Sequence, residues 1–328
     1  MIYIRKGGTE MGFKEIYGQN RAIAFLRAGF KAGRNSHAYL FYGPEGVGKF
    51  KTAVAFAQLL NCSSPTEEAE PCGTCSPCRK IASGSHPDLI VVRPDGNSLK
   101  IEQMRALQEK VYYKCYEGKF KVIMIVDAHL LTIEAANSLL KVLEEPPAET
   151  VFILLANDLN KLPVTIHSRC QPLPFSYLDE TVLRRILWEQ GKEIPSSLAL
   201  AQGSVSKALE MVDNAGYQQF WEQAKANFEV IKQGGYREIF SWAEKLDKLK
   251  DRKLMEITLE WLLVMYRNKI VEKDFSGADL AGCFAALEEI NKAVYALKNN
   301  GNYRLTIEVL FIKLRNIEQR ERGVIPND

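Results

Sequence analysis

Short apolar runs alternate with helical patterns through the first half of the chain. Four runs are almost continuously apolar, as in strands buried on both faces: 38–43, 88–94, 121–127 and 151–158. Three intervening segments carry apolar side chains at helical spacing: 50–62, 98–113 and 132–147. Because strands and helices alternate, the pattern predicts an α/β domain with a parallel sheet covered by helices on both faces.

The strand signal fades after residue 175, and the remaining chain is a series of amphipathic helical patterns. We therefore predict an α/β domain over 12–175, a small helical domain over 176–214 and a helical bundle over 215–328. Residues 1–11 share no pattern with the helix that follows them, and we expect them to form a disordered tail.

Composition and charge fit a globular protein. The 328 residues are 46% hydrophobic and 25% charged, and no apolar run is long enough to cross a bilayer. No apolar stretch of a signal peptide occurs near the N-terminus, so we expect a cytoplasmic protein without a membrane partner. The net charge of +3 does not favour tight independent DNA binding, but it leaves open DNA contact within an assembly.

The segment GPEGVGKFKT at 43–52 follows a predicted strand and opens a predicted helix. Gly43, Gly46 and Gly48 permit a tight turn whose backbone N–H groups can bind phosphate, and Lys49 would contact the outer phosphates. The pattern G-x-x-x-x-G-K-[ST] requires a hydroxyl after the lysine to hold Mg²⁺. Phe50 occupies that position and has no oxygen to offer.

The acidic residues needed for hydrolysis are also incomplete. Asp127 ends the strand at 121–127, where a carboxylate can hold Mg²⁺. The next position often carries a second carboxylate that polarises the attacking water, but here it is Ala128. His129 follows, and we interpret it as a structural residue. The sequence therefore predicts a phosphate loop without ATP hydrolysis and leaves nucleotide binding itself open.

Four of the seven cysteines lie close together, at Cys62, Cys72, Cys75 and Cys78. Four thiolates can enclose Zn²⁺ in a tetrahedron with no open position, so we predict a structural zinc module over 62–78. Free thiols and an iron–sulfur cluster are the alternatives. The remaining cysteines are interpreted as small buried hydrophobic residues: Cys115, Cys170 and Cys283.

Ser168, Arg169 and Cys170 come after the last predicted strand. An arginine at such a position is usually a surface or salt-bridge residue. In a nucleotide-driven ring it can instead present its guanidinium to the γ-phosphate of a neighbouring subunit, where it stabilises the transition state. Arg169 is thus a candidate for chemistry in trans.

Five features together resemble a known family: HAYLFYGPEGVGK, the four-cysteine insertion, HPDLI, VDAHLLTIEAANSLLKVLEEPP and SRC. They are similar to the clamp-loader subunits of bacterial DNA polymerase III, which belong to the AAA+ group. The likeness covers about residues 12–212 strongly and the C-terminal helices in general character. The resemblance implies an AAA+ domain with a zinc-binding insertion, a small helical lid domain and an all-α collar domain.

Three departures distinguish this sequence from the motor subunits gamma and tau of that family. Motor subunits carry Thr, Glu and a sensor Arg where this chain has Phe50, Ala128 and Ser206. The departures resemble the inactive delta-prime branch, and Asn157 matches the first sensor position of the family.

Likeness to that branch implies a non-hydrolysing stator that offers Arg169 to a motor subunit. The implied partners are gamma/tau and delta subunits, the sliding clamp and primed DNA.

Two other functions fit the sequence less well. An active gamma/tau-type ATPase would need another group, such as the hydroxyl of Thr52 or a water, to replace the missing loop hydroxyl, but Thr52 is two residues too late along the helix. A zinc-dependent nucleic-acid-binding module would be expected to carry a stronger positive charge than +3. The non-hydrolysing subunit is the interpretation that explains all three departures.

Overall fold

The computed structural model describes residues 12–233, 235–249, 252–272, 277–299 and 301–321. The chain divides into two compact units, Met1–Glu189 with Gln202–Lys207, and Gln190–Ala201 with Ala208–Asp328. The predicted tail at 1–11 lies outside the described residues. The division into domains at residues 175 and 214 stays a prediction.

The first unit is built on one five-stranded parallel sheet, with the strand order β2-β3-β4-β1-β5. Its strands are β1 (Ala38–Tyr42), β2 (Leu89–Val92), β3 (Lys121–Ile125), β4 (Thr150–Ala156) and β5 (Gln171–Pro174). Three of them lie within the apolar runs that predicted them, and β4 begins one residue before its run, so the predicted parallel sheet is confirmed.

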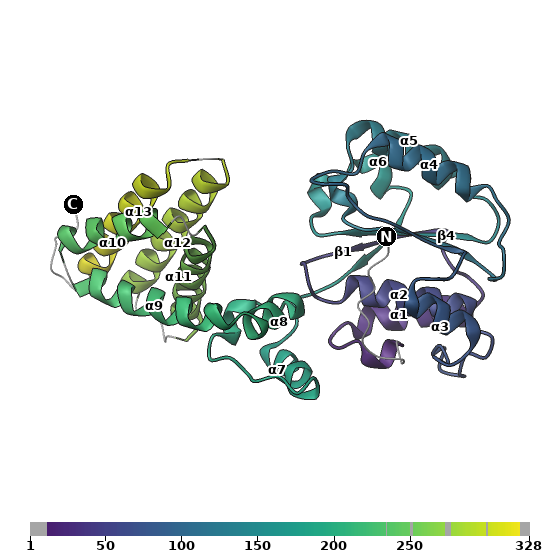
Figure 1. Ribbon diagram of the computed structural model, residues 1–328, viewed down its shortest axis with the longest axis horizontal. Coiled ribbons are helices and arrows are strands. Elements are labelled where there is room, and N and C mark those ends of the chain that lie inside the picture. The colour runs from purple at the N-terminus through teal and green to yellow at the C-terminus, as the bar shows by residue number, and fades with distance from the viewer. Residues whose placement is uncertain (1–11, 234, 250–251, 273–276, 300, 322–328) are drawn as a thin grey trace. The chain divides into compact units, whose positions relative to one another are not determined.

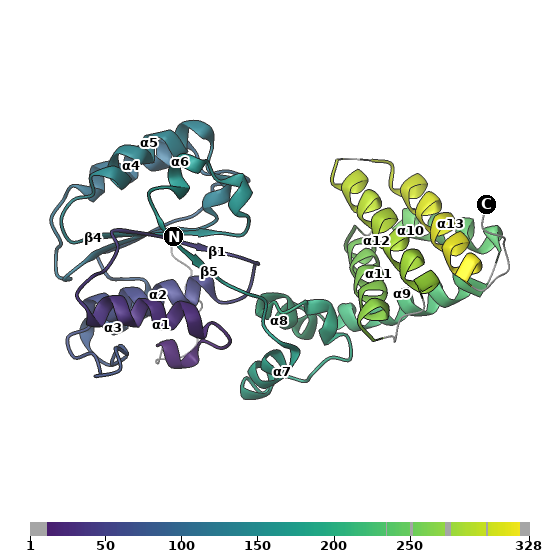
Figure 2. The ribbon, with the colours of Figure 1, turned by 180° about the vertical axis from the view of Figure 1, so that it is seen from behind.

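Helices cover both faces of this sheet, as Figure 1 and the reverse view in Figure 2 show. One face is covered by α1 (Asn20–Lys31), α2 (Lys49–Asn61) and α3 (Ser76–Ser83). The other is covered by α4 (Ile101–Val111), α5 (Ile133–Glu144) and α6 (Val164–His167). The unit also contains α7 (Glu180–Glu189) and the start of α8 (Val205–Asp213), with 3-10 helices at Phe13–Glu15, Ala128–Leu130 and Leu159–Lys161.

The sheet separates two hydrophobic cores because side chains alternate along each strand. Tyr39 and Phe41 of β1 join the core on the α2 side, whereas Ala38 and Leu40 join the core on the α5 side. Both faces of β3 and β4 are buried throughout, which explains their unbroken apolar sequences. The carboxyl ends of β1, β3 and β4 therefore meet at one rim of the sheet, where the candidate site lies.

Several short elements of this unit, β5 and α3 among them, were not predicted. β5 has the sequence QPLP, and its prolines cannot donate ladder hydrogen bonds, so it lacks the composition of a strand. It is accommodated because it lies at the edge of the sheet and pairs only with β1 among the described residues. α3 lies inside the cysteine-rich insertion and starts at a Ser-Pro pair, with the proline in the first turn, where its missing N–H costs nothing.

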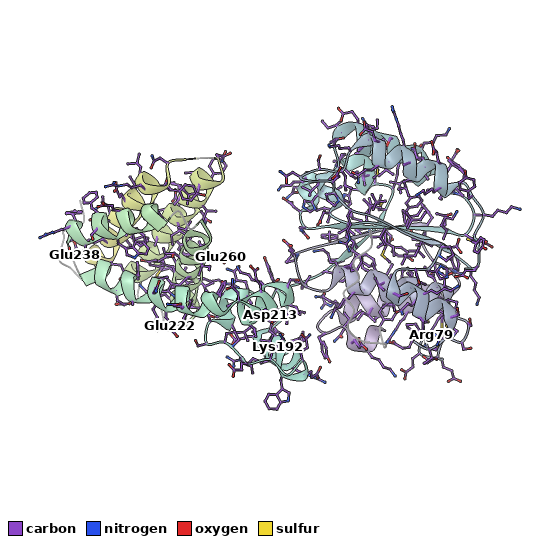
Figure 3. The ribbon with its side chains drawn as sticks, viewed as in Figure 1. Arg79, Lys192, Asp213, Glu222, Glu238 and Glu260 are labelled. Carbon is purple, nitrogen blue, oxygen red and sulfur yellow. The ribbon has the colours of Figure 1, made fainter. Side chains whose placement is uncertain are left out.

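The second unit is helical. It contains a 3-10 helix at Leu198–Ala201 and α9 (Ala215–Gln233), α10 (Tyr236–Leu249), α11 (Arg252–Glu272), α12 (Gly277–Lys298) and α13 (Tyr303–Glu321). Phe228, Trp261 and Phe311 pack in edge and tilted arrangements within its core. Lys192 forms an ion pair with Asp213, both labelled in Figure 3. The predicted helical C-terminal region is confirmed.

Candidate functional site

The predicted phosphate loop connects β1 to the N-terminus of α2, the arrangement in which backbone N–H groups face an anion. Gly43, Gly46 and Gly48 all have positive φ angles, of 139°, 75° and 105°. A Cβ on Gly43 would come within 2.1 Å of the carbonyl oxygen of Phe175, so this position has no room for a side chain. A glycine turn is therefore present between β1 and α2, with glycine at each of these left-handed positions, and its binding of phosphate stays a prediction.

Lys49 begins α2 and is 7% exposed. Its Nζ donates to the carbonyl oxygen of Gly43 at 2.6 Å and to that of Pro44. Burial lowers the pKa of Lys49 to about 8, while Asp127 and Glu45 act in the opposite direction. Backbone carbonyls thus hold the Lys49 ammonium at the loop. A phosphate bound there would stabilise its positive charge more strongly than these neutral carbonyls do.

Phe50 places an aromatic ring where the pattern requires a hydroxyl. The ring packs against the core on the α2 side, together with Val91 and Phe120. The guanidinium of Arg93, just after β2, lies 4.7 Å from the centre of the ring. The positive charge beside Phe50 is therefore that of the Arg93 guanidinium, which contacts the face of the aromatic ring.

Asp127 follows β3 in a left-handed conformation with φ 54°. Ala128 is completely buried, so no carboxylate occupies the second acidic position. The Nδ1 atom of His129 accepts a hydrogen bond from the backbone N–H of Asn157 at 3.3 Å, and burial lowers the pKa of this histidine. The geometry agrees with a structural part for His129, which links the end of β4 to the turn after β3.

The start of α8 lies against the phosphate loop within the first unit. The backbone N–H of Val205 donates to the carbonyl oxygen of Gly46 at 2.9 Å. A Cβ on Gly46 would lie 2.2 Å from Oγ of Ser204 and 3.0 Å from Oγ of Ser206. Ser206 thus reaches the loop with a short hydroxyl and no charge.

Gln19 is a contributor to this site that the sequence did not single out. It is 4% exposed, and its amide donates to the carbonyl oxygens of Val47 and Ser176 at 3.2 and 2.8 Å. It accepts from the N–H of Ser176 in return. Gln19 therefore fixes the phosphate loop to the segment after β5, a link over 157 residues that no local sequence signal indicates.

Arg169 lies between α6 and β5, away from the phosphate loop in sequence. Its Nη1 donates to the carbonyl oxygen of Thr165 at 2.9 Å and to Oγ of Ser168 at 3.3 Å. Its Nε donates to Oε1 of Glu144 at 2.7 Å, and Nη2 contacts the same oxygen. The side chain of Arg169 is 30% exposed, so it is oriented by its neighbours and still accessible from outside.

The four clustered cysteines converge. Their Sγ atoms all lie within 4.8 Å of one another, with Cys62 and Cys78 buried and Cys72 and Cys75 partly exposed. In a tetrahedron with metal–sulfur bonds of about 2.3 Å, sulfurs stand about 3.8 Å apart. The 4.0 Å between the sulfurs of Cys62 and Cys75 is close to that value. The cluster could therefore bind a metal ion.

Backbone N–H groups around this cluster favour the thiolate form, with the largest effect at Cys72, whereas burial raises the pKa of Cys62 and Cys78. The N–H of Cys72 donates to the sulfur of Cys62 at 3.3 Å, and the N–H of Cys75 donates to the sulfur of Cys72 at 3.4 Å. Burial raises the pKa of Cys72, but N–H donors from Cys75 and Thr74 outweigh it and lower the pKa to about 6. Gln58 of α2 holds the module through a hydrogen bond to the carbonyl oxygen of Cys78 at 2.9 Å.

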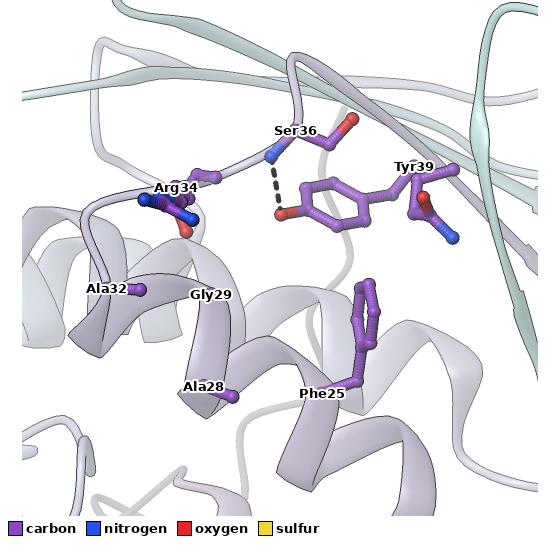
Figure 4. Close-up of a pocket in the computed structure, with 9 residues that line it drawn as sticks. Phe25, Ala28, Gly29, Ala32, Arg34, Ser36 and Tyr39 are labelled. Atoms are coloured by element: carbon purple, nitrogen blue, oxygen red, sulfur yellow. Dashed lines mark hydrogen bonds between the residues drawn. The ribbon is translucent and has the colours of Figure 1, made fainter.

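A separate pocket of about 430 Å³ lies between the C-terminal half of α1 and the starts of β1 and β5. Figure 4 shows Phe25 and Tyr39 among its walls, with Ser36 donating to the Tyr39 hydroxyl. Because this pocket is at the amino ends of the strands, it is not part of the phosphate loop, which follows the carboxyl end of β1.

Comparison with known proteins agrees with the motifs. The family described as "DNA polymerase III, delta subunit" matches residues 18–179. A DNA polymerase III subunit delta' from Bacillus subtilis is 36% identical over 253 residues, which are 76% of this chain and 76% of that protein. The chain belongs to the delta-prime family of DNA polymerase III subunits.

Members of the tau/gamma group are also similar to this delta-prime family chain. A subunit tau/gamma from Haemophilus influenzae is 41% identical over 212 residues, 62% of this chain and 30% of that protein. The chain thus spans about a third of the length of that relative. A solved structure of a gamma-subunit-related protein from Thermotoga maritima is 16% identical, with a TM-score of 0.47 over 89% of this chain and 99% of that one.

Delta-prime membership and the parallel sheet together confirm the fold class, an AAA+ domain followed by a helical region. Within the described ranges, no helix has the length and apolar character needed to cross a membrane. The same ranges contain one metal-competent cluster, that of the four cysteines.

Proposed function

We propose that this chain is a non-hydrolysing subunit of a DNA polymerase III clamp loader, a stator that supplies Arg169 to a neighbouring motor subunit. Its partners would be gamma/tau and delta subunits, the sliding clamp and primed DNA. The observation that carries this proposal is Phe50, which occupies the sequence position of the metal-binding hydroxyl and whose ring packs against the core. Ala128 and Ser206 support it at two further positions of the catalytic apparatus.

The chemistry of hydrolysis explains why these positions matter. Mg²⁺ bridges the outer phosphates only if the loop hydroxyl and an aspartate hold it, and a positioned acceptor must orient the attacking water. Here Asp127 remains, while Phe50 and Ala128 supply neither oxygen nor charge. Loss of one such group costs orders of magnitude in rate, so the loss of both leaves a loop that can contact phosphate without cleaving it.

The geometry of Thr52 argues against the alternative of an active gamma/tau-type ATPase. Thr52 is completely buried, and its hydroxyl donates to the carbonyl oxygen of Gly48 at 3.0 Å. That hydroxyl is directed back along α2 and is not available to a metal ion at the loop.

Arg169 supports a role in trans. Its guanidinium is partly exposed and oriented by three neighbouring residues, which limits the entropy lost when it meets a phosphate. An arginine that stabilises a γ-phosphoryl transition state increases the rate by about 10³-fold or more. In this proposal the chain contributes that charge to a site whose loop belongs to a neighbour.

We also propose that the four cysteines hold a structural Zn²⁺. Four thiolates with N–H donors suit a closed tetrahedral site, and no ligand position would remain for substrate. Bound there, the ion would cross-link the insertion and would take no part in a reaction. Cys62, Cys72, Cys75 and Cys78 would be its ligands.

The test has two arms. The isolated chain, incubated with Mg²⁺–ATP and primed DNA, should release no phosphate above background. In a reconstituted clamp loader, Arg169→Ala should reduce ATP turnover at the adjacent motor site by about three orders of magnitude. The total ATPase rate of the complex should then fall by the fraction that this site contributes. Robust hydrolysis by the isolated chain, or unchanged turnover in the complex, would contradict the proposal.

A further inference from the structure

Three tyrosines stand out on the surface of the first unit, in the loop between α4 and β3. Tyr112, Tyr113 and Tyr116 are 58%, 71% and 84% exposed. We call residues 112–119 the tyrosine loop. Single exposed aromatic residues are common, but three within five positions form a local patch, and such patches usually mark an interaction site.

A buried carboxylate fixes the second half of this loop. Asp88, at 2% exposure, accepts backbone N–H groups from Tyr116, Glu117 and Gly118 at 2.7, 2.9 and 2.8 Å. Three donors converging on one carboxylate constrain the backbone strongly. Gly118 is needed there because a Cβ would come within 3.2 Å of the same carboxylate and 2.6 Å of the Asn61 side chain.

A buried lysine fixes the first half. Lys121 starts β3 and is 4% exposed. Its Nζ donates to the carbonyl oxygens of Lys110 at 3.0 Å and of Tyr113. These carbonyls belong to the end of α4 and the start of the loop, so the lysine satisfies groups that a helix end leaves without partners.

These two anchors hold the backbone while leaving the rings outside. A loop that existed only to connect α4 to β3 would not need two buried charged side chains to fix it, and would not expose its largest apolar groups. A fixed backbone also reduces the ordering cost when the rings meet a partner. The loop therefore has the form of a preorganised binding surface.

Charge indicates the kind of partner. Lys110, Lys114 and Lys119 are exposed on and beside the loop. The one acidic residue between Lys110 and Lys121 is Glu117, and its carboxylate is paired with Lys80 of α3 at 2.6 Å. Arg79, the neighbour of Lys80 on α3, is also exposed and is labelled in Figure 3.

The composition of the loop distinguishes between two classes of partner. The core of a protein–protein interface is enriched in aromatic residues, methionine and arginine, and it is depleted in lysine. The sequence YYKCYEGK at 112–119 contains two lysines and neither arginine nor methionine. Tyrosine rings interleaved with lysines are instead the combination that binds single-stranded nucleic acid, in which bases stack on rings and phosphates meet cations.

We propose that the tyrosine loop is a binding site for single-stranded DNA, with the bases stacked on Tyr112, Tyr113 and Tyr116 and the phosphates neutralised by Lys114 and Lys119. The proposal rests on the proposed function only for the source of that DNA, the template strand beside a primer. It is independent of Arg169 and of nucleotide hydrolysis.

The experiment uses the full-length, metal-loaded chain and a fluorescein-labelled oligo-dT, with binding followed by anisotropy at low salt. Changing the three tyrosines to serine together should weaken binding by at least about tenfold. Lys114→Gln and Lys119→Gln should each lower the slope of log affinity against log salt by about 0.7. An abasic oligonucleotide should bind the wild type no better than oligo-dT binds the triple variant.

Two variants serve as matched controls. Trp188→Ser removes an exposed aromatic residue from α7, and Lys31→Gln removes an exposed cation from α1, and both should bind oligo-dT as the wild type does. Thermal unfolding of all variants should coincide, because the altered side chains are exposed. Arg169→Ala should also leave oligo-dT binding unchanged, which separates this proposal from the proposed function.

The proposal is overturned if the wild type shows no affinity for oligo-dT at low salt, or if the triple variant binds as tightly as the wild type. A triple variant that binds oligo-dT normally but fails to join a reconstituted complex would assign the loop to a protein partner instead. Reduced binding by the Trp188→Ser control to the same extent would equally refute a site at the loop.

Discussion

Glu144, at the end of α5, forms an ion pair with the guanidinium of Arg169, which lies just before β5. Two nitrogens of Arg169 contact a single carboxylate oxygen of Glu144, and a third donates to the carbonyl of Thr165. Glu144 is the last residue of α5, where the helix dipole disfavours a negative charge. Because the pair is exposed, it adds little to stability, so its consequence is the fixed orientation of Arg169.

We predict that Glu144→Gln lowers ATP turnover of a reconstituted complex without lowering the melting temperature. The guanidinium would lose its charged partner and sample other rotamers, and misplacement of a catalytic group by about 1 Å can cost up to about a hundredfold at the affected site. A double-mutant cycle measures the coupling, since Glu144→Gln should have no further effect once Arg169 is alanine.

Glu145→Gln is the matched control, because Glu145 is exposed and adjacent but makes no contact with Arg169 among the described residues. Turnover that rises in Glu144→Gln would mean that the pair restrains Arg169 instead of orienting it. Equal effects of the two substitutions would remove the argument for Glu144 altogether.

Lys49 should make stability depend on pH in the alkaline range. Burial lowers its pKa from the ordinary 10.5 to about 8, so between these values the unfolded chain binds the proton and the folded chain does not. The folded state is therefore penalised fully below pH 8, and the penalty disappears as the pH rises towards 10.5. Relative to a Lys49→Met variant, the wild type should gain up to about 3 kcal/mol of unfolding free energy over this range.

Urea unfolding of both proteins at pH 7 and pH 10 gives the difference, in which the titration of all other groups cancels. Lys51→Met is a suitable control, since Lys51 is exposed on the same helix turn. A constant difference between the wild type and Lys49→Met would show that Lys49 keeps its proton throughout, and that the loop carbonyls compensate its burial.

Local patterns predicted the parts of the fold that are encoded locally. β3 and β4 were predictable because both faces are buried and their sequences are continuously apolar. The glycine turn at 43–48 and the convergence of the four cysteines depend on spacing within a few residues, and the structure contains both. β5 was not predictable, because its two prolines are unusual in a strand. Its extended conformation depends on pairing with β1, which is distant in sequence.

Contacts between distant segments could not be read from the sequence. Glu144 and Arg169 are 25 residues apart, and neither motif indicates that the other exists. The sequence predicted that Phe50 offers no metal ligand. It could not predict the contact between the Phe50 ring and Arg93, because that contact depends on where the end of β2 lies in three dimensions. The zinc ligands, the nucleotide-loop roles and the trans role of Arg169 stay predictions.

Asp88 should be a strong determinant of stability. Burial raises its pKa, but the three backbone N–H donors outweigh burial, and the pKa lies below its ordinary value. Asp88→Asn would present an amide group to donors that need an acceptor, at a cost of about 2–4 kcal/mol of unfolding free energy at pH 7. The stabilisation is present above the ordinary pKa of the carboxylate and is lost as the pH falls below it.

Urea unfolding at pH 7 and at pH 3 measures this effect. The difference in unfolding free energy between the wild type and Asp88→Asn should narrow at the lower pH. There the Asp88 carboxylate takes up a proton in the unfolded chain before it does so in the folded chain. Asp95→Asn, at an exposed position in the next loop, should change stability by no more than about 0.5 kcal/mol at either pH. A gap of equal size at both values would contradict the assigned charge of Asp88.

Metal removal should loosen more than the cysteine module. Glu70, two residues before Cys72, is 4% exposed and joins the module to the N-terminal part of the unit. Its carboxylate accepts the backbone N–H of Lys14 at 3.0 Å and pairs with Arg27 of α1. The 3-10 helix at Phe13–Glu15 contacts α2, so the module, this helix and the phosphate-loop helix form a continuous set of contacts.

We therefore predict that a chelator lowers the melting temperature and increases amide hydrogen exchange both at 62–83 and at 13–16. Glu70→Gln in the metal-loaded chain should reproduce the increase at 13–16 alone, because the neutral amide weakens both contacts. Glu67→Gln, which alters an exposed carboxylate in the same module, should leave exchange unchanged. Protection at 13–16 that survives both the chelator and Glu70→Gln would show that the N-terminal segment is held by Phe13 and Ile16 in the core, independently of the metal.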